Sequence, residues 1–394
     1  MLLPTGGQAV QVVSATKVSV PTGASSSAIS GSSWLLGGAT DPAPPQRSPA
    51  AWISTDLDDP AGFTAIAMYP LPGYGEIAEM FGIAGRATTE GLSDIAAIGQ
   101  AFGGAHGNPR TASWDGSSAG MSEVRTNFEL YNGVRQISVR SITELNGTYV
   151  IFGSRVNQNG RLGAASWTSA EGDQFVLHDN DPALSSASNE QVQGLALTVG
   201  ARVEGSTGSR RVFIAAGERL WWDPANSADT IGTDAAVWRS DDGLAWQRWT
   251  PPGFVLGGPG EQRITSVGEA EGQFVAAGTE SVDGSVRAVF WSAAGKRRIP
   301  VFGSTDDPLS AVTSIARVGS WWIVGARMGG ALKLAASRDG RSWTRLSMPS
   351  TGVPTGGRAK VVVIPDTGES VLVGFSGLDG GGLWRAERCK LLKC

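Results

Sequence analysis

The run Tyr149-Val150-Ile151-Phe152-Gly153 is followed by Ala165-Ser166-Trp167, and this pair of elements recurs along the chain. In each copy a short apolar run ends on glycine, and a small residue beside tryptophan comes roughly fifteen residues later. Runs this short, rich in β-branched and aromatic residues, are typical of strands buried on both faces. The seven runs end at Gly37, Gly99, Gly153, Gly217, Gly278, Gly325 and Gly374.

A tryptophan marks the strand that follows the glycine run in six of the seven units. The sixth unit carries Ser337 where the ring would stand. One large ring per unit can fill the space between neighbouring sheets, so we interpret these residues as structural core. The six are Trp52, Trp114, Trp167, Trp238, Trp291 and Trp384.

Each unit contains the signals of four antiparallel strands. An extended segment precedes the glycine run, as at residues 137–143, and the turn Asn146-Gly147 joins the two. A further short strand follows the tryptophan, for example at residues 175–178. A period of roughly 45–65 residues built only from strands predicts an all-β, seven-bladed β-propeller with four-stranded blades. Residues 1–394 then form a single domain, and six blades plus an extra sheet is the alternative.

The last unit shows only three strands before the chain ends. We therefore expect residues 1–16, with the β-like segment at residues 9–15, to supply the missing outer strand of the last blade and close the ring. Closure of this kind removes a free sheet edge. Residues 388–394 are then a C-terminal tail.

The composition excludes several classes of function. The net charge is −4 and the basic residues are scattered, so we expect no nucleic-acid partner. The chain contains no stretch of 18 apolar residues, so we expect no transmembrane helix. Two histidines are too few for a His-based triad or a multi-His metal site, and no motif indicates a cofactor. Asp-Pro turns, such as Asp181-Pro182, are interpreted as ordinary turns in preference to calcium sites.

The two cysteines, Cys389 and Cys394, lie in the last six residues. Their spacing allows a small disulfide, which indicates an oxidising compartment, and two free thiols are the alternative. The first residues lack the basic region and long apolar core of a signal peptide. We expect an extracellular or cell-envelope protein whose chain has been trimmed, with a cytoplasmic protein as the alternative.

Two turns share the pattern Ser-x-Asp-Gly-x-x-Trp, at residues 240–246 and 337–343. They resemble a shortened form of the Asp-box repeat of sialidase-type propellers. The resemblance implies a tight turn between the third and fourth strands, capped by the aspartate, with the tryptophan packed below it. Physical chemistry agrees, because aspartate bonds the backbone two residues on and glycine takes the positive φ. The structural residues are Ser240, Asp242, Gly243, Trp246, Ser337, Asp339, Gly340 and Trp343.

The catalytic residues of sialidases have no clear counterpart in this chain. The resemblance implies an arginine triad, a tyrosine paired with glutamate and an aspartate acid/base. Arg298-Ile299-Pro300 is similar to one sialidase element, but it follows a tryptophan strand, so we interpret it as coincidence. No tyrosine has an adjacent glutamate in a matching pattern. A generic pair of glycosidase carboxylates stays open, because its spacing is invisible in the sequence.

Long, aromatic connections are the candidate binding elements. In propellers the loops after the second and fourth strands share one face, and function concentrates in such loops. We expect a non-catalytic binding or scaffold protein that contacts a protein partner there; a glycan-active hydrolase or glycan-binding module is the alternative. The aromatic residues could instead fold back over their blades. The predicted ligand-binding residues are Trp221, Trp222, Asp223, Tyr69, Tyr74 and Phe254.

Overall fold

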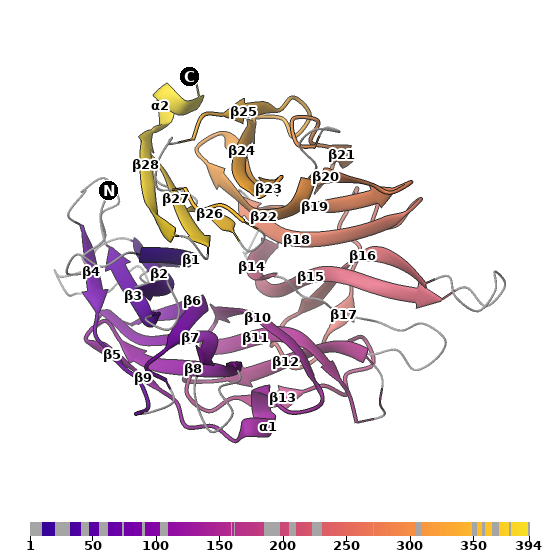
Figure 1. Ribbon diagram of the computed structural model, residues 1–394. Helices are drawn as coiled ribbons and strands as arrows, with labels where there is room; N and C mark the ends of the chain where they lie inside the picture. Colours follow the sequence, from indigo (N-terminus) through magenta and orange to yellow (C-terminus); the bar gives the residue numbers. More distant parts are fainter. Residues whose placement is uncertain are drawn as a thin grey trace.

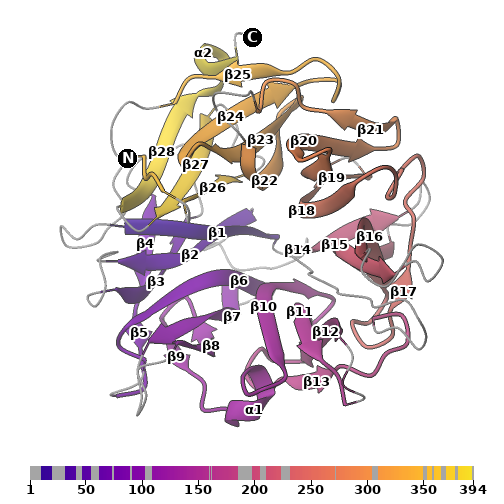
Figure 2. The ribbon, with the colours of Figure 1, turned by 45° about the vertical axis from the view of Figure 1, so that its right-hand side comes forward.

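Seven sheets surround one axis in the computed structural model, and each is built from consecutive strands (Figures 1 and 2). Apart from the short β5, the strands within each sheet run antiparallel, in the order of the sequence, from the axis outwards. The predicted seven-bladed β-propeller is confirmed. The structure describes residues 10–19, 32–40, 47–54, 62–72, 75–88, 91–102, 109–158, 160, 162–184, 198–204, 210–222, 231–270, 272–303, 309–348, 353–356, 359–364, 370–377 and 380–392.

The blades follow one another along the chain, beginning with the sheet nearest the N-terminus. Blades 1 and 2 contain β1 (Val10–Ser19), β2 (Ser32–Thr40), β3 (Ser48–Ser54) and β4 (Phe63–Ile66), then β6 (Ala78–Thr88), β7 (Gly91–Phe102), β8 (Pro109–Ser117) and β9 (Gly120–Glu123). The short β5 (Met68–Tyr69) lies parallel to β9. Blades 3 and 4 contain β10 (Gln136–Leu145), β11 (Thr148–Val156), β12 (Leu162–Ser169) and β13 (Val176–His178), then β14 (Thr198–Glu204), β15 (Arg210–Trp222), β16 (Ile231–Ser240) and β17 (Gln247–Arg248).

The remaining three blades complete the ring. Blades 5 and 6 contain β18 (Glu261–Ala270), β19 (Gln273–Val282), β20 (Ser285–Ser292) and β21 (Gly295–Arg298), then β22 (Leu309–Val318), β23 (Trp321–Met328), β24 (Ala331–Ser337) and β25 (Thr344–Leu346). Blade 7 contains β26 (Lys360–Ile364), β27 (Ser370–Gly377) and β28 (Gly380–Glu387). Helix α1 (Phe128–Tyr131) lies between blades 2 and 3, and α2 (Arg388–Leu392) follows β28.

In five of the seven blades, the glycine that ends the apolar run lies opposite an irregularity in the innermost strand. In blade 3 the pairing of β10 with β11 skips a residue between Val139 and Ser141, opposite Gly153. A side chain at Gly153 would place its Cβ 2.1 Å from the Ser138 carbonyl oxygen. The same contact in blade 5 would be 1.9 Å, between Gly278 and the Arg263 carbonyl oxygen. A β-bulge in the inner strand therefore demands glycine in the next one.

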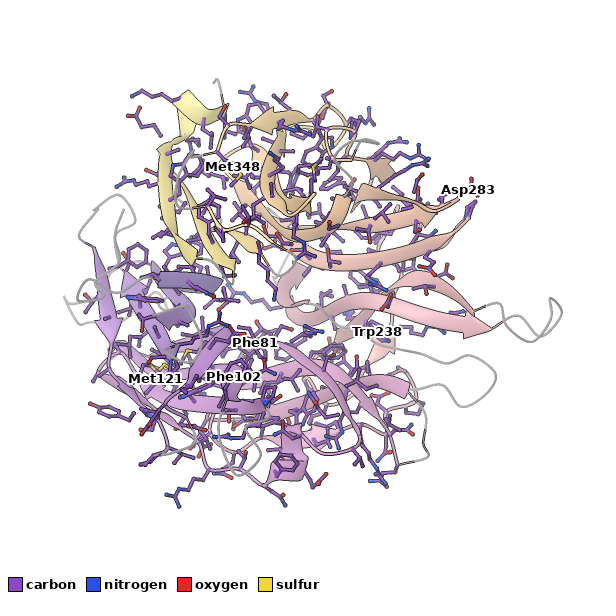
Figure 3. All side chains as sticks on the ribbon, viewed as in Figure 1. Phe81, Phe102, Met121, Trp238, Asp283 and Met348 are labelled. Atoms are coloured by element: carbon purple, nitrogen blue, oxygen red, sulfur yellow. The ribbon has the colours of Figure 1, made fainter. Side chains whose placement is uncertain are left out.

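The residue skipped at each bulge is partly or fully exposed, although it belongs to the innermost strand. Such a residue is out of the ladder, and the neighbouring blades leave the axis as the direction open to it. Figure 3 labels one of them, Phe81 on β6. The set comprises Val13, Phe81, Arg140, Thr265 and Thr313.

The predicted closure of the ring by the N-terminal strand is not what the structure shows. Strand β1 pairs with β2 and is the innermost strand of blade 1, so it does not extend the sheet of blade 7. The first unit needed an inner strand of its own, and this segment is that strand. Blades 1 and 7 meet face to face, where Val12 packs on Gly374 and the Gln11 side-chain amide donates to the Gly377 carbonyl oxygen over 2.5 Å.

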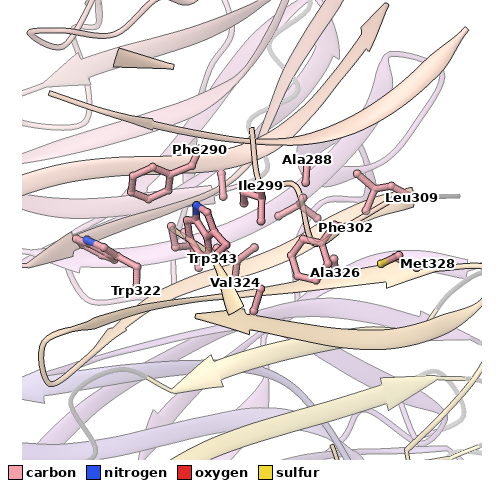
Figure 4. Packing of buried hydrophobic residues seen from close by; sticks show 14 of the residues in the cluster. Ala288, Phe290, Ile299, Phe302, Leu309, Trp322, Val324, Ala326, Met328 and Trp343 are labelled. Carbon is pink, nitrogen blue, oxygen red and sulfur yellow. The ribbon is translucent and has the colours of Figure 1, made fainter. Parts of the chain in front are cut away.

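Aromatic rings fill the space between blades. The tryptophans of the first five third strands are at most 1% exposed, as predicted for structural core. Figure 4 shows one such interface, where Phe290 of blade 5 meets Trp322 and Trp343 of blade 6. The Phe290 and Trp343 ring centroids are 5.5 Å apart at an edge-on angle of 67°. Aromatic pairs prefer such edge-on geometry, which favours one relative placement of the two sheets.

The two Ser-x-Asp-Gly-x-x-Trp turns have the same hydrogen bonds. Asp339 Oδ1 accepts from the backbone N–H groups of Arg341 and Ser342, each over 2.8 Å, and Ser337 Oγ accepts from Gly340 N–H over 2.9 Å. Gly340 has φ +68° and lies against the Phe290 ring, so both backbone and packing require glycine. Asp242 makes the equivalent bonds in blade 4.

The C-terminal tail forms α2, where Cys389 is exposed. Its expected partner, Cys394, lies outside the described residues, so the disulfide stays a prediction.

We expect Gly278→Ala to lower the free energy of unfolding by about 1 to 3 kcal/mol, because its methyl group would overlap a backbone carbonyl. Gly268→Ala, in the same strand pair, is the matched control, since its Cβ would meet ordinary contacts at 3.5 Å. Denaturant unfolding of the two variants measures the difference. Equal stability of the two would contradict the role given to the bulge.

The ionisation of Asp339 should make the stability of the fold depend on pH in acid. Backbone hydrogen bonds from Ser342 and Arg341 lower its pKa to about 2, below the value of about 3.9 in an unfolded chain. Its contribution to stability is therefore complete above about pH 4 and is lost as the pH falls toward 2. Asp339→Asn keeps an acceptor but no titrating group, so its melting temperature should fall less than the wild type's between pH 4 and 2.

The matched control removes a carboxylate outside any such turn. Asp283, at the tip of the β19–β20 hairpin (Figure 3), is exposed and serves this purpose as Asp283→Asn. An equal fall in melting temperature for Asp339→Asn and the wild type would show that the turn hydrogen bonds do not depend on ionisation.

Candidate functional site

One face of the ring carries the connections after the second and the fourth strand of each blade, because the strands alternate in direction. We call it the loop face. Trp221 and Trp222 end β15 there. Their side chains, together with Asp223 and Tyr74, lie outside the described residues, so their role in binding stays a prediction.

Tyr69 is available for contact, but far from the axis. Its side chain is 60% exposed, and β5 pairs with β9, the outermost strand of blade 2. The ring lies over Gly120, where an added Cβ would be 2.7 Å from the Tyr69 ring. Tyr69 therefore lies on the outer side of blade 2, beside the turn between β8 and β9.

Phe254 corrects the predicted set, because it is buried. It is 7% exposed and stacks on Phe274, with ring centroids 5.5 Å apart at 23°. The carbonyl oxygen of its neighbour Val255 accepts from the Trp291 indole N–H over 2.9 Å. This connection folds over blades 4 and 5, which was the alternative interpretation of the aromatic loops, and Phe254 is a core residue.

The buried carboxylates of the loop face are held in ion pairs. The Glu123 side chain has no exposed surface; Arg110 contacts one oxygen at 2.5 Å and Leu71 N–H donates to the other over 3.0 Å. Glu218, 2% exposed, bonds Arg263 of blade 5 over 2.6 Å. A buried carboxylate without a cation would cost several kcal/mol, so these pairs are part of the scaffold.

Two further buried carboxylates also lie beside cations. Glu280 bonds Lys296 over 2.6 Å, and Asp179 lies 3.7 Å from Arg155. Burial raises the pKa of Glu218, and the adjacent Arg263 opposes that rise. The four carboxylates belong to four different blades. Two carboxylates facing one substrate, as glycoside hydrolysis requires, are not found among these buried groups in the described part of the chain.

Arg140 differs from the cations above, because it is in no such ion pair with a described carboxylate. It is the skipped residue of the β10 bulge, and it is exposed although β10 is the innermost strand of blade 3. Among the described residues no carboxylate forms an ion pair or hydrogen bond with its guanidinium. The surrounding blades still exclude part of the water, and this burial lowers the pKa of Arg140.

Lys360 is a second exposed cation on an innermost strand. It begins β26, the innermost strand of blade 7, and its side chain reaches solvent. Burial lowers the pKa of Lys360, and the positive charges of Arg140 and Arg327 lower it further, while Glu79 raises it. Blades 3 and 7 are not neighbours in the ring, so their inner strands can interact in this way only across the axis.

The charged and polar groups next to Arg140 and Lys360 already form other ion pairs or hydrogen bonds. Glu79 bonds Arg47. Arg327 donates from Nη1 to the Ala359 carbonyl oxygen over 3.2 Å, while its buried Nε has no hydrogen-bond acceptor among the described residues. The bulge residue Thr313 donates its hydroxyl to the Val361 carbonyl oxygen of the next blade over 3.0 Å. Arg140 and Lys360 are therefore two cations, within the described part of the chain, that are available to a ligand at the axis.

Exposed apolar side chains gather on the loop face. Seven large apolar side chains of the described chain are exposed, and four of them belong to loop-face connections or to strand ends beside them. Single exposed apolar residues are ordinary on a protein surface, but their concentration on one face is what a binding surface requires. The four are Phe128, Val134, Val255 and Val286.

Within the described residues, neither helix is long or apolar enough to cross a membrane. A search of the same residues for three or more metal-ligating side chains close together finds no such group.

The comparisons with known proteins bear only on the fold. No family model matches the chain, and no curated protein matches it. The β-propeller domain of the Trilobed protease from Pyrococcus furiosus is 8% identical, with 96% of this chain and 93% of that one covered and a TM-score of 0.45. Trypanosoma rangeli sialidase, bound to the inhibitor DANA, is 13% identical over 84% of this chain and 57% of its own, with a TM-score of 0.42.

A third solved structure is an acylaminoacyl peptidase from Pyrococcus horikoshii. It is 9% identical, with a TM-score of 0.43, and the match covers 97% of this chain and 51% of the peptidase. This chain therefore spans about half the length of that enzyme. At these identities and TM-scores none of the three similarities carries an argument about activity.

The sequence pattern contained a signal for Arg140 that was not used. Arg140 is the only charged residue in the extended segment at residues 137–143, between Val139 and Ser141. A cation in a strand that is otherwise buried needs a partner or a route to water. Lys360, at the first position of its strand, gave no comparable signal, because strand ends are commonly polar.

We expect Arg140→Met to raise the pKa of Lys360, because it removes a positive charge from across the axis while keeping much of the side-chain volume. Titration of the Lys360 side chain by NMR measures the change. Lysine labelling by acetic anhydride gives a second readout, since less neutral amine at a fixed pH means slower labelling. An unchanged Lys360 in both assays would contradict the contact across the axis.

Proposed function

We propose that this protein is a non-catalytic binding propeller whose loop face holds a protein partner and takes an acidic side-chain group of that partner at the axis. The observation that carries the proposal is that two exposed cations, Arg140 and Lys360, stand on the innermost strands of two blades, with no described carboxylate bonded to either. Two like charges so placed repel each other, and an anion between them would turn that repulsion into attraction.

The surface around the axis supports a protein partner. Four exposed apolar side chains on the loop face would provide the contact area, and the charged centre would provide orientation. The buried carboxylates named above are already paired with cations, which supports binding over hydrolysis. Trp221 and Trp222, at the loop-face end of β15, remain predicted contacts.

A fluorescein-labelled hexaglutamate peptide is the probe for the axial site. We expect Arg140→Met and Lys360→Met each to weaken its binding at least about fivefold, roughly 1 kcal/mol. Higher salt should weaken wild-type binding as well. Fluorescence anisotropy measures both effects.

Arg297→Met is the matched control, because Arg297 is exposed on the outer strand β21. It should leave binding unchanged, and a hexalysine peptide should not bind. Equal losses for all three variants would show a diffuse charge effect and overturn the axial site. Release of nitrophenol from aryl glycosides by the wild-type protein would support a hydrolase instead.

A further inference from the structure

The bulges of the innermost strands lie at one level along the axis, which we call the bulge level. The Thr265 hydroxyl donates over 2.8 Å to the carbonyl oxygen of Val312, the residue before the next bulge residue, Thr313. Thr313 donates in the same way, over 3.0 Å, to the Val361 carbonyl oxygen of blade 7. These two bonds hold the inner strands of blades 5, 6 and 7 at a common height.

Close contacts continue the bulge level through blade 1. A Cβ on Gly374 of blade 7 would lie 2.5 Å from the side chain of Val12, the residue directly before the bulge residue Val13. On the other side of blade 1, a Cβ on Gly37 would lie 3.3 Å from the Ile83 side chain of blade 2. The inner strands of blades 7, 1 and 2 therefore meet at the positions of the repeat glycines.

The same level reaches Arg140 in blade 3. Gly82 directly follows the bulge residue Phe81, and Ile142 lies two residues after Arg140. A Cβ on Gly82 would lie 3.3 Å from the Ile142 backbone nitrogen. Phe81 and Arg140 therefore stand at matching heights on the inner strands of two neighbouring blades.

The side chains of the bulge level are apolar in character apart from one cation. Six blades contribute a described side chain to this level, and solvent reaches each of the six. Both threonine hydroxyls donate to the next blade, so their methyl groups are the parts that a ligand would contact. Arg140 is the one charged residue among the six, and Val362 takes the place in blade 7 because it pairs with Gly374. The six are Val13, Phe81, Arg140, Thr265, Thr313 and Val362.

Lys360 adds a second cation on the loop-face side of this level. It lies two positions before Val362, so the two side chains leave β26 on the same side. The axis thus combines cationic groups with an apolar wall. This combination suits a ligand that joins one negative charge to an apolar body, since a polyanion would bring further charges against apolar groups.

Phe81 is the largest apolar group of the bulge level. Its ring packs on the buried cluster between blades 2 and 3 and is still partly exposed. A ring held from one side loses little freedom when a ligand covers the other side, so the contact is already organised before binding.

We propose that the bulge level binds a carboxylate carried on an apolar chain, with the carboxylate on Arg140 and the chain against Phe81 and Val13. The inference rests on the proposed function in using Arg140 as the axial cation, and it goes beyond that function by naming what carries the carboxylate. A free fatty acid and an apolar carboxyl-terminal residue of a protein partner share this chemistry.

A series of unbranched acids tests the wild-type protein without any variant. Butyrate, hexanoate and octanoate should bind about twofold or more tighter for each added methylene group, because each one covers more apolar surface. The alcohol 1-octanol has the chain of octanoate without its charge, and it should bind at least about tenfold more weakly. Isothermal titration calorimetry on the full chain measures these affinities, and Arg140→Met should remove the difference between octanoate and octanol.

Phe81→Ala tests the apolar wall. It should weaken octanoate binding at least about fivefold and change hexaglutamate binding no more than about twofold. Phe81→Leu keeps an apolar contact and should retain octanoate binding within about threefold, which separates loss of contact from loss of folding. Leu244→Ala is the matched control, because Leu244 is exposed in the turn between β16 and β17, away from the axis.

Two peptides distinguish the sources of the carboxylate. The probe is acetyl-Gly-Ser-Gly-Leu-Leu with a free carboxyl group, and the control is the same peptide with a carboxyl-terminal amide. Tighter binding of the free-acid peptide than of octanoate, lost on amidation, would assign the site to the carboxyl terminus of a protein partner. Tighter binding of octanoate would assign it to a free acid, and both results support the inference.

The outcomes separate this inference from the proposed function. Equal binding of butyrate and octanoate, with hexaglutamate still bound, would overturn the inference and leave the proposed function standing. Octanoate binding that depends on chain length and on Arg140, without hexaglutamate binding, would do the reverse. Equal binding of octanoate and octanol would mean that apolar contact alone is at work, and it would also overturn the inference.

Discussion

A backbone carbonyl pressed against a glycine is the contact on which the inner ring depends. The bulge in an inner strand directs one carbonyl at the next strand, and only a residue without Cβ fits there, as at Gly153 and Gly278. The extra residue of the bulge leaves the ladder, and in blade 3 it is Arg140. In blade 3, one packing constraint thus explains both the glycine that ends the apolar run and the position of the axial cation.

Much of the fold could be predicted because its constraints are local. The glycine runs, the tryptophan strands and the turns around Asp242 and Asp339 each follow from residues near one another in the sequence. Closure of the ring could not be predicted correctly, because two pairings were compatible with the N-terminal segment. Its apolar pattern fits a strand, but a pattern does not say which strand it pairs with.

The site was harder to predict for a related reason. Arg140 and Lys360 are 220 positions apart in the sequence and meet only because a ring brings non-adjacent blades to one axis. Phe254 illustrates the opposite error: an aromatic residue in a Pro- and Gly-rich loop suggested exposure, whereas the loop folds back on Phe274. Sequence gives the chemistry of a loop but not the direction in which it packs.

The seam between blades 1 and 7 has a consequence for how the chain folds. Each sheet joins segments that are close in sequence, so a blade can form soon after it is synthesised. The seam is different, since Gln11 must wait for Gly377, 366 residues later. Until then blade 1 has an apolar face without its neighbour, with Val12, Trp34 and Leu36 in the cluster that blade 7 completes. Ring closure is therefore the late step, and the interval before it is when the nascent chain is most exposed to aggregation.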